Sequence, residues 1–265
     1  MISYSIKEGI NGIPKIPGDK SISHRSIIIP SISNGVCEIS NILKSDDVLH
    51  TLNAFKEMGV KIIENQNKLI IYGKGLNSLQ KPNKEIYLGN SGTSARLLTG
   101  LLSSQKFDTV LKGDSSLSKR PMERISNPLK KMKANIKTNN GTLPIIIKGT
   151  NLESTSIDLQ IPSAQIKSGL LLAGLNTRGE TVITENRITR DHTEIMLSSF
   201  GASIDVKKFE NKKIIKILGL KELTSKKIEV PNDLSSSAFF IVCGLINNNS
   251  KIILRNINNN PTRNG

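Results

Sequence analysis

Lysine, arginine and serine residues gather where helices are expected to begin. The stretch GDKSISHRS places Lys20, Ser21, Ser23 and Arg25 directly before the apolar residues 27–29. The first turn of a helix carries unpaired backbone N–H groups and a partial positive charge, which favour a phosphate or a carboxylate. A serine alone at such a place is explained by helix capping. Because capping requires no neighbouring Lys and Arg, the whole cluster indicates a site for a small phosphorylated ligand.

Two further stretches have the residue types of an anion-binding loop. The sequence GNSGT at 89–93 is followed by Arg96, and its glycines allow a ligand to approach the backbone closely. The sequence GDSSLSKRPM at 113–122 presents Arg120 before Pro121, which suits the first position of a helix. An arginine here could form a paired contact with a carboxylate or a phosphate. The alternative is a solvated turn.

The stretch SAQIKS at 163–168 combines a hydroxyl, an amide and an ammonium group. These groups could bind a polyol and an anion together. The alternative is a helix cap followed by an exposed Lys167. Both interpretations place the start of a helix at this point.

The stretch TRDHTE at 189–194 holds Asp, His and Glu together, which could be catalytic. However, Asp191 and Glu194 also fit capping and first-turn positions, and we assign His192 to the start of a helix. No residue spacing in the sequence matches a set of metal ligands or a nucleophile elbow. The motifs therefore indicate binding more strongly than catalysis, and no catalytic residue is assigned.

These motifs recur at a regular interval. The aligned serines are spaced by 70, 72 and 72 residues, and they are Ser21, Ser91, Ser163 and Ser235. Around them an extended segment, an apolar helix, a strand, a second helix and a strand pair predict units of the form β-α-β-α-β-β. The second helices are predicted over 47–58, 122–132 and 192–200, with Pro128 expected to interrupt the middle one. Units of this length favour a compact arrangement around shared helices over an open array.

The composition restricts the kind of partner. Lys and Arg exceed Asp and Glu by 37 to 22, so the chain carries a formal charge of +15 and an anionic partner is expected. Aromatic residues make up only 3% and Trp is absent, which argues against a nucleic-acid surface. The N-terminus lacks the pattern of a signal peptide, and no apolar run approaches the length of a membrane span. We therefore expect a cytoplasmic protein that binds neither nucleic acid nor a membrane.

Taken in order along the chain, DKSISHR, LGNSGT, GDSSLSKRPM, PSAQIKS and RDHTE closely resemble the motifs of the 5-enolpyruvylshikimate-3-phosphate synthases. The resemblance implies transfer of the enolpyruvyl group of phosphoenolpyruvate to shikimate 3-phosphate, without a cofactor, in the shikimate pathway to chorismate and the aromatic amino acids. It implies an α/β fold, a two-lobed inside-out α/β barrel of β-α-β-α-β-β units. By this resemblance residues 14–228 form a complete lobe, and residues 1–13 and 229–265 are parts of a second, incomplete lobe.

The resemblance also assigns roles to individual residues. Lys20 lies between the two substrates, and Ser21 and Arg25 bind shikimate 3-phosphate. Gly92 and Arg120 match positions that bind phosphoenolpyruvate. Ser163 and Gln165 match binders of shikimate 3-phosphate, with Gln165 also near phosphoenolpyruvate, and Thr189 or Arg190 is a weaker candidate. The main carboxylates of the family are expected beyond Gly265. We therefore expect a C-terminally truncated chain that does not turn over alone, and a full-length protein that is a monomer.

Other functions are compatible with parts of this pattern. The enolpyruvyl transferase that acts on UDP-N-acetylglucosamine shares the architecture, but its motif has Asn after the Lys, so Ser21 and Arg25 favour the shikimate substrate. A non-catalytic half-protein that binds a phosphorylated ligand agrees with the interrupted fourth unit, which begins near Ile228. A basic nucleic-acid binder has only the net charge in its favour.

Overall fold

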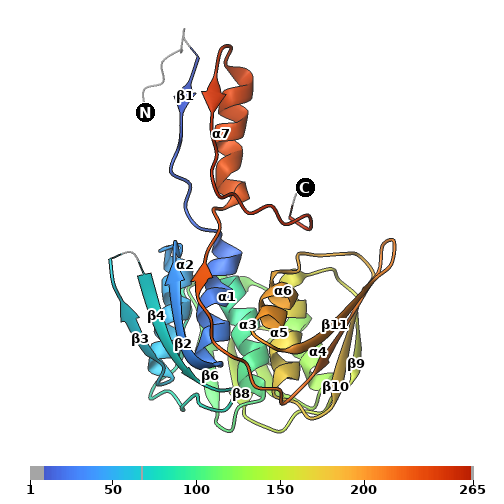
Figure 1. Cartoon of the computed structure of the whole chain (residues 1–265). Coiled ribbons are helices and arrows are strands. Elements are labelled where there is room, and N and C mark those ends of the chain that lie inside the picture. Colours follow the sequence, from blue (N-terminus) through green and yellow to red (C-terminus); the bar gives the residue numbers. More distant parts are fainter. Residues whose placement is uncertain (1–8, 67, 264–265) are drawn as a thin grey trace.

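The structure is a computed structural model and describes residues 9–66 and 68–263. Sheets on the outside surround a group of central helices, and one helix projects from this body (Figure 1). The elements follow in the order β1 (Asn11–Gly12), α1 (Lys20–Ser31), β2 (Asn34–Ser40), α2 (Asp46–Glu57), β3 (Lys61–Glu64), β4 (Lys68–Lys74), β5 (Ile86–Tyr87), α3 (Gly92–Ser103), β6 (Thr109–Lys112), a 3-10 turn (Leu117–Lys119), α4 (Glu123–Lys131), β7 (Asn135–Asn139), β8 (Thr142–Lys148), β9 (Ser156–Leu159), α5 (Ala164–Leu175), β10 (Glu180–Glu185), α6 (His192–Ser199), β11 (Ser203–Lys208), β12 (Lys213–Leu218), β13 (Ile228–Glu229), α7 (Leu234–Ile246) and β14 (Lys251–Ile252).

The repeated unit predicted from the sequence is confirmed. Across the described ranges, the large sheets have the orders β5-β6-β8-β7, β9-β10-β12-β11 and β13-β2-β4-β3. In each sheet the first two strands run parallel, and the other pairs run antiparallel. The three sheets therefore share the same order and direction of strands.

The first unit obtains its opening strand from a distant part of the chain. The pattern placed an extended segment before each first helix, yet the matching position beside β2 is filled by β13. Ile228 pairs with Ile39 and Glu229 with Ser40, in a parallel register. The segment before α1 instead contributes β1, which pairs in parallel with β14. Residues more than 180 positions apart thus complete the first sheet.

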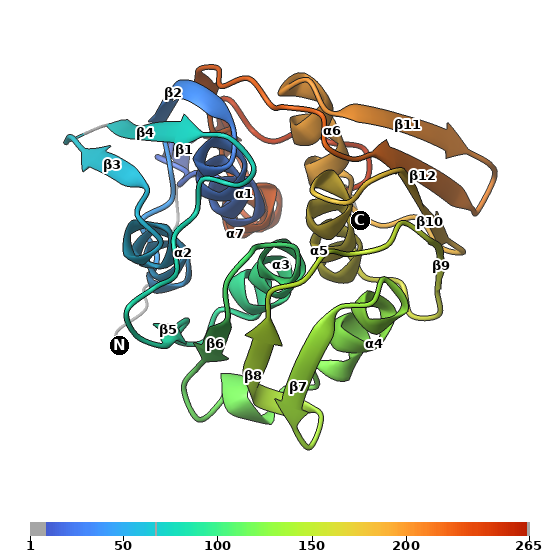
Figure 2. The ribbon, with the colours of Figure 1, turned by 90° about the horizontal axis from the view of Figure 1, so that it is seen from below.

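The helices α1, α3 and α5 lie at the centre of the molecule, inside the ring of sheets (Figure 2). Ten of the twelve residues of α5 are buried, and all of these except Lys167 are apolar or small. The helices α3 and α5 approach so closely that a Cβ atom on Gly100 would lie 1.9 Å from the carbonyl oxygen of Gly169. Small residues permit this contact. The predicted α/β class with helices inside the sheets is confirmed.

The second helix of each unit begins close to where the pattern placed it, but Pro128 does not interrupt α4 as expected. The helix continues from Glu123 to Lys131. Proline removes only one backbone donor, and Ile125 and Leu129 on the same face are fully buried in the core. Burial of this face outweighs the lost hydrogen bond in a helix of only two and a half turns.

The helix α7 and the pair β1–β14 project away from the ring (Figure 1). Two close backbone contacts join this projection to the ring: Asp19 N donates to Pro231 O at 2.8 Å, and Asp233 N donates to Pro17 O at 2.8 Å. Large apolar side chains of α7 are exposed, including Phe239 and Leu245 at 80% each. Among residues 9–66 and 68–263, no helix has the length and apolar character needed to cross a bilayer.

Candidate anion-binding site

A pocket of about 400 Å³, here called the polar pocket, opens between the starts of α1 and α5 and the loop before α6. Its lining residues are Ser21, Arg25, Thr93, Pro162, Ser163, Ala164, Gln165, Thr189, Arg190, His192 and Thr262. The structure therefore places Ser21, Arg25, Ser163, Gln165, Thr189 and Arg190, all singled out from the sequence, around one cavity. Residues from separate repeats meet here because the starts of their first helices converge.

The side chain of Arg25 is held rigidly in the wall of this pocket. Its Nε donates to Thr193 Oγ1 at 2.6 Å, its Nη2 to Ser168 Oγ at 2.7 Å, and its Nη1 to Ser21 O at 2.8 Å. Burial lowers the pKa of Arg25 to about 10, while the charges of Glu194 and Asp19 oppose the decrease. The guanidinium stays charged at neutral pH. Of its five N–H donors, two are not used by the bonds within the described residues and can serve an anion.

The serines at the helix starts have different roles. Ser91 and Ser163 are the N-caps of α3 and α5, and each side chain accepts a backbone N–H. In α1 the cap is Asp19, whose Oδ1 accepts from Ile22 N at 3.0 Å. Because Asp19 takes the capping role, the hydroxyl of Ser21 is available to the polar pocket.

Gln165 connects the polar pocket to a second basic region. Its Nε2 donates to Thr93 Oγ1 at 3.0 Å, and its Oε1 accepts from Arg96 Nη1 at 3.0 Å. Arg96 Nη1 also donates to Gly92 O at 3.0 Å. The amide of Gln165 thus lies between the start of α5 and the start of α3, so it can contact ligands on both sides.

Gly92, Arg96 and Arg120 form this second region, here called the arginine cluster. A Cβ on Gly92 would lie 2.7 Å from Arg96 Nη1 and 3.1 Å from Arg120 Nη1, so both guanidinium groups are close to the helix start. Arg120 Nη2 donates to Asn90 Oδ1. Burial and the charges of Arg120 and Arg124 lower the pKa of Arg96. Two guanidinium groups beside the first turn of α3 make a site for an anion.

Two lysines differ in position from the other candidates. The side chain of Lys20 is half exposed and forms an ion pair with Asp47 at 3.1 Å, outside the lining of the polar pocket.

Lys167 was expected either to contact an anion or to be exposed, and both interpretations are wrong. It is fully buried, with Nζ 2.8 Å from Glu185 Oε2 and 2.8 Å from Glu194 Oε1. An ammonium group in this environment requires such partners.

Asp191 and His192, at the start of α6 beside the polar pocket, have contacts that the sequence did not reveal. Asp191 occupies the expected N-cap position of α6, but its carboxylate accepts from Asn260 Nδ2 at 2.7 Å and Thr262 Oγ1 at 3.0 Å. Burial would raise the pKa of Asp191, but these bonds and Lys213 lower it. Burial and the charge of Arg25 lower the pKa of His192 to about 4, so this ring is neutral at pH 7. Asn260 and Thr262 lie 69 and 71 residues from Asp191 in the sequence, beyond the reach of any local pattern.

Behind the site, His24 belongs to a buried chain of hydrogen bonds. Its Nδ1 lies 2.8 Å from Thr51 Oγ1, which in turn lies 2.5 Å from Ser94 Oγ. Ser94 lies 2.6 Å from Ser91, the cap of α3. Burial and the charge of Arg25 lower the pKa of His24 to about 3. The chain links α1, α2 and α3 through neutral groups.

This histidine predicts an acid sensitivity of the fold. Because the pKa of His24 falls from 6.5 to about 3 on folding, the unfolded state binds the proton more readily, and stability decreases as pH falls below 6.5. We expect the free energy of unfolding in urea to drop by about 2–3 kcal/mol between about pH 7.5 and 4.5 from this group alone. The variant His24→Gln should show a shallower decrease, to which His192 still contributes. Parallel pH profiles for the two proteins would contradict the assignment.

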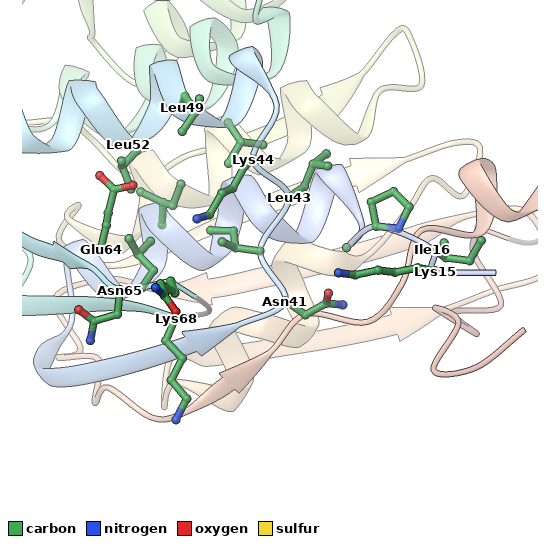
Figure 3. Close-up of a pocket in the computed structure, with 17 residues that line it drawn as sticks. Lys15, Ile16, Asn41, Leu43, Lys44, Leu49, Leu52, Glu64, Asn65 and Lys68 are labelled. Carbon is green, nitrogen blue, oxygen red and sulfur yellow. The ribbon is translucent and has the colours of Figure 1, made fainter. Parts of the chain in front are cut away.

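A different pocket is lined by residues of α1, α2, β4 and the neighbouring loops of the first unit (Figure 3). It has a volume of about 340 Å³ and combines apolar side chains such as Leu43, Leu49 and Leu52 with Lys15 and Lys44 at its edge. None of the predicted site residues lines it. Over the part of the chain that the structure describes, no group of three or more His, Cys, Asp or Glu is placed to hold a metal ion.

Three repeated sheets around central helices, with a pocket lined by Arg25 and Arg190 at the helix starts, define an α/β protein of repeated β-α-β-α-β-β units. The family model of EPSP synthase (3-phosphoshikimate 1-carboxyvinyltransferase) matches residues 5–265, and the chain belongs to this family. The 3-phosphoshikimate 1-carboxyvinyltransferase of Ruthia magnifica is 53% identical over 257 residues, which are 97% of this chain and 58% of the relative. That of Bacillus thuringiensis is 45% identical, over 100% of this chain and 61% of the relative.

The fold comparison agrees with this membership. A solved EPSP synthase from Acinetobacter baumannii superposes with a TM-score of 0.90 at 47% identity, covering 97% of this chain and 58% of that chain. This chain therefore spans about three fifths of the length of the relatives it matches.

Proposed function

We propose that the polar pocket binds shikimate 3-phosphate and that the protein acts as a 3-phosphoshikimate 1-carboxyvinyltransferase. The observation that carries this proposal is the placement of Arg25 in the pocket wall. Its guanidinium is buried, charged and fixed by Thr193 and Ser168, with donors left for a ligand. A rigid fork of this kind suits a phosphate, and the surrounding hydroxyl and amide groups suit the ring hydroxyls.

The residues around the pocket have complementary roles in this proposal. Ser21, Ser163 and Gln165 would bind hydroxyl or phosphate oxygens, and Thr189 with Arg190 would form the opposite wall. Arg190 adds a positive charge at the pocket edge. Lys20 begins α1 beside Ser21, and its ammonium group would have to leave Asp47 to lie between two bound substrates.

The arginine cluster would bind phosphoenolpyruvate. Gly92 exposes the first turn of α3, and Arg120 and Arg96 supply charge for a carboxylate or a phosphate. Gln165 contacts Arg96 and Thr93 and also lines the polar pocket, so it would bring the two substrates together. Binding two anions in neighbouring sites supplies the proximity that a transfer between them needs.

The proposed reaction joins a hydroxyl oxygen of shikimate 3-phosphate to the central carbon of phosphoenolpyruvate, while the hydroxyl gives up its proton to a base and the methylene carbon takes a proton from an acid. Loss of phosphate and of a proton from the new methyl group then restores the double bond. General acid and base groups are needed for both steps. We propose that these groups lie in the part of the relatives that this chain does not span, so that its own residues bind and orient the substrates.

A binding measurement tests the proposed function. Titration calorimetry of the 265-residue chain with shikimate 3-phosphate should give one site with a dissociation constant in roughly the micromolar range, corresponding to about 8 kcal/mol. Shikimate without its phosphate should bind at least about tenfold more weakly, since it lacks the group that Arg25 would hold. Binding of UDP-N-acetylglucosamine in place of shikimate 3-phosphate would contradict the proposal. Phosphate release with both substrates would show whether the chain turns over alone.

We further propose that residues 14–228 form one lobe and that residues 1–13 and 229–265 belong to a second. The projection of α7 from the ring and its exposed apolar side chains, such as Phe239 and Leu245, support this division. A helix face of this kind is normally buried against other elements. We propose a cytoplasmic location and a monomeric full-length protein.

A further inference from the structure

Behind the polar pocket lies a chain of ion pairs, here called the buried ion chain, formed by Glu185, Lys167, Glu194 and Lys213. The side chains of Lys167, Glu185 and Lys213 are 0% exposed, and that of Glu194 is 3% exposed. Lys167 Nζ lies 2.8 Å from Glu185 Oε2 and 2.8 Å from Glu194 Oε1, and Lys213 Nζ lies 2.9 Å from Glu194 Oε1. The chain joins β10, α5, α6 and β12 in the third unit.

The presence of buried ion pairs of this kind is not explained by a gain in folding stability. Removing charges from water is costly, and apolar side chains of similar volume often give an equally stable core. The strands that carry Glu185 and Lys213 also hold apolar residues such as Ile183 and Ile215, which are fully buried and lie opposite each other. What the ion pairs add over apolar packing is directional contact, which fixes the elements that carry them.

One end of the buried ion chain holds the loop 186–191. Thr189 Oγ1 donates to Glu185 Oε1, and Lys167 Nζ donates to Thr189 O at 3.5 Å. The other end reaches Asp191, whose Oδ2 lies 3.7 Å from Lys213 Nζ. Thr189 and Arg190 in this loop line the polar pocket, while Arg190 itself is exposed. The buried ion chain thus contacts the loop 186–191 at both Thr189 and Asp191.

The middle of the buried ion chain fixes the partners of Arg25. Ser168 follows Lys167 in α5, and Thr193 precedes Glu194 in α6. These hydroxyls lie 2.6 Å apart and both accept from the guanidinium. The contact between Lys167 and Glu194 therefore joins α5 and α6 one residue away from the two hydroxyls that hold Arg25.

We propose that the buried ion chain is a positioning device for the polar pocket: it fixes the loop 186–191 against the start of α5 and holds the hydroxyl groups that orient Arg25. The residues Lys167, Glu185, Glu194 and Lys213 are positioning residues, because they act through Thr189, Ser168 and Thr193. The functional consequence rests on the proposed binding of shikimate 3-phosphate.

The test uses the full chain with Lys167→Met, which keeps the length of the side chain and removes its charge. Amide hydrogen exchange should become at least about tenfold faster in residues 186–191. Calorimetry should show at least about tenfold weaker binding of shikimate 3-phosphate. The matched control is Ile183→Ala, which weakens the core of β10 at a fully buried position and removes no charge. It should lower the melting temperature but leave both the loop exchange and the affinity close to those of the unsubstituted chain.

A milder variant covers the case in which Lys167→Met does not fold. Glu185→Gln keeps the shape of the side chain and leaves Lys167 paired with Glu194, so it should fold and still loosen the hold on Thr189, with about three- to tenfold weaker binding. Loop exchange and affinity in both charge variants equal to those in Ile183→Ala would overturn the inference. If the unsubstituted chain does not bind shikimate 3-phosphate, the proposed function fails, and the loop exchange alone decides whether the buried ion chain fixes the loop.

Discussion

Replacement of Arg25 by alanine should weaken the binding of shikimate 3-phosphate by about 100-fold. The guanidinium is charged, is held by Thr193, Ser168 and the backbone of Ser21, and keeps donors for a phosphate in the polar pocket. A hydrogen bond to a charged group contributes about 1.5–3 kcal/mol of free energy. A loss of about 3 kcal/mol of binding free energy corresponds to about 100-fold weaker binding. Titration calorimetry measures it directly.

The variant Arg25→Lys separates the charge from the geometry. It keeps a positive charge but lacks the fork that satisfies Thr193 and Ser168 together, so about tenfold weaker binding is expected. A melting curve for each variant checks that the ring of sheets is intact. If Arg25→Ala bound shikimate 3-phosphate as tightly as the unsubstituted chain, the pocket assignment would be wrong.

Replacement of Gly100 by alanine should cause the largest loss of stability, about 3 kcal/mol or more. A Cβ at this position would lie 1.9 Å from the carbonyl oxygen of Gly169 and 2.7 Å from its Cα, and both are backbone atoms that cannot rotate away. The helices α3 and α5 would have to separate at the centre of the molecule. Urea unfolding should show the midpoint shifted to much lower concentration, and expression of folded protein should fall.

The matched control is the same substitution in α7. A Cβ on Gly244 would lie 3.2 Å from Ile252 Cδ1, the end of a flexible side chain. Alanine is favoured over glycine in a helix by about 1 kcal/mol, so Gly244→Ala should leave stability unchanged or slightly higher. Equal destabilisation by both substitutions would show that close helix packing is not the cause.

The repeated architecture could be predicted from the sequence because its signals are local. Apolar spacing, turn residues and the regular interval between Ser21, Ser91 and Ser163 marked the helix starts, and the unit β-α-β-α-β-β followed from them. The motifs that the sequence singled out as binding stretches lie around the polar pocket and the arginine cluster. These binding stretches could be recognised because they lie at helix starts. The position of a helix start determines where its side chains lie.

The parts that could not be predicted depend on contacts between distant residues. Nothing near Lys167 indicated that Glu185 and Glu194 would neutralise it in the core, so its burial was missed. The capping of α1 by Asp19 rather than by the aligned serine also departs from the repeat. The effect of Pro128 was overestimated because its penalty is local, while the burial of Ile125 and Leu129 that offsets it is a property of the whole fold.

The strand β13 has a consequence for how the chain reaches its native state. The sheet of the first unit lacks an edge strand until Ile228 and Glu229 have been synthesised and have returned to Ile39 and Ser40. One edge of β2 in the N-terminal unit is therefore unpaired while the other two units are synthesised. An unpaired edge is open to association with other chains. Closure over this sequence separation is a non-local event, and we expect it to be slower than the formation of contacts within each unit.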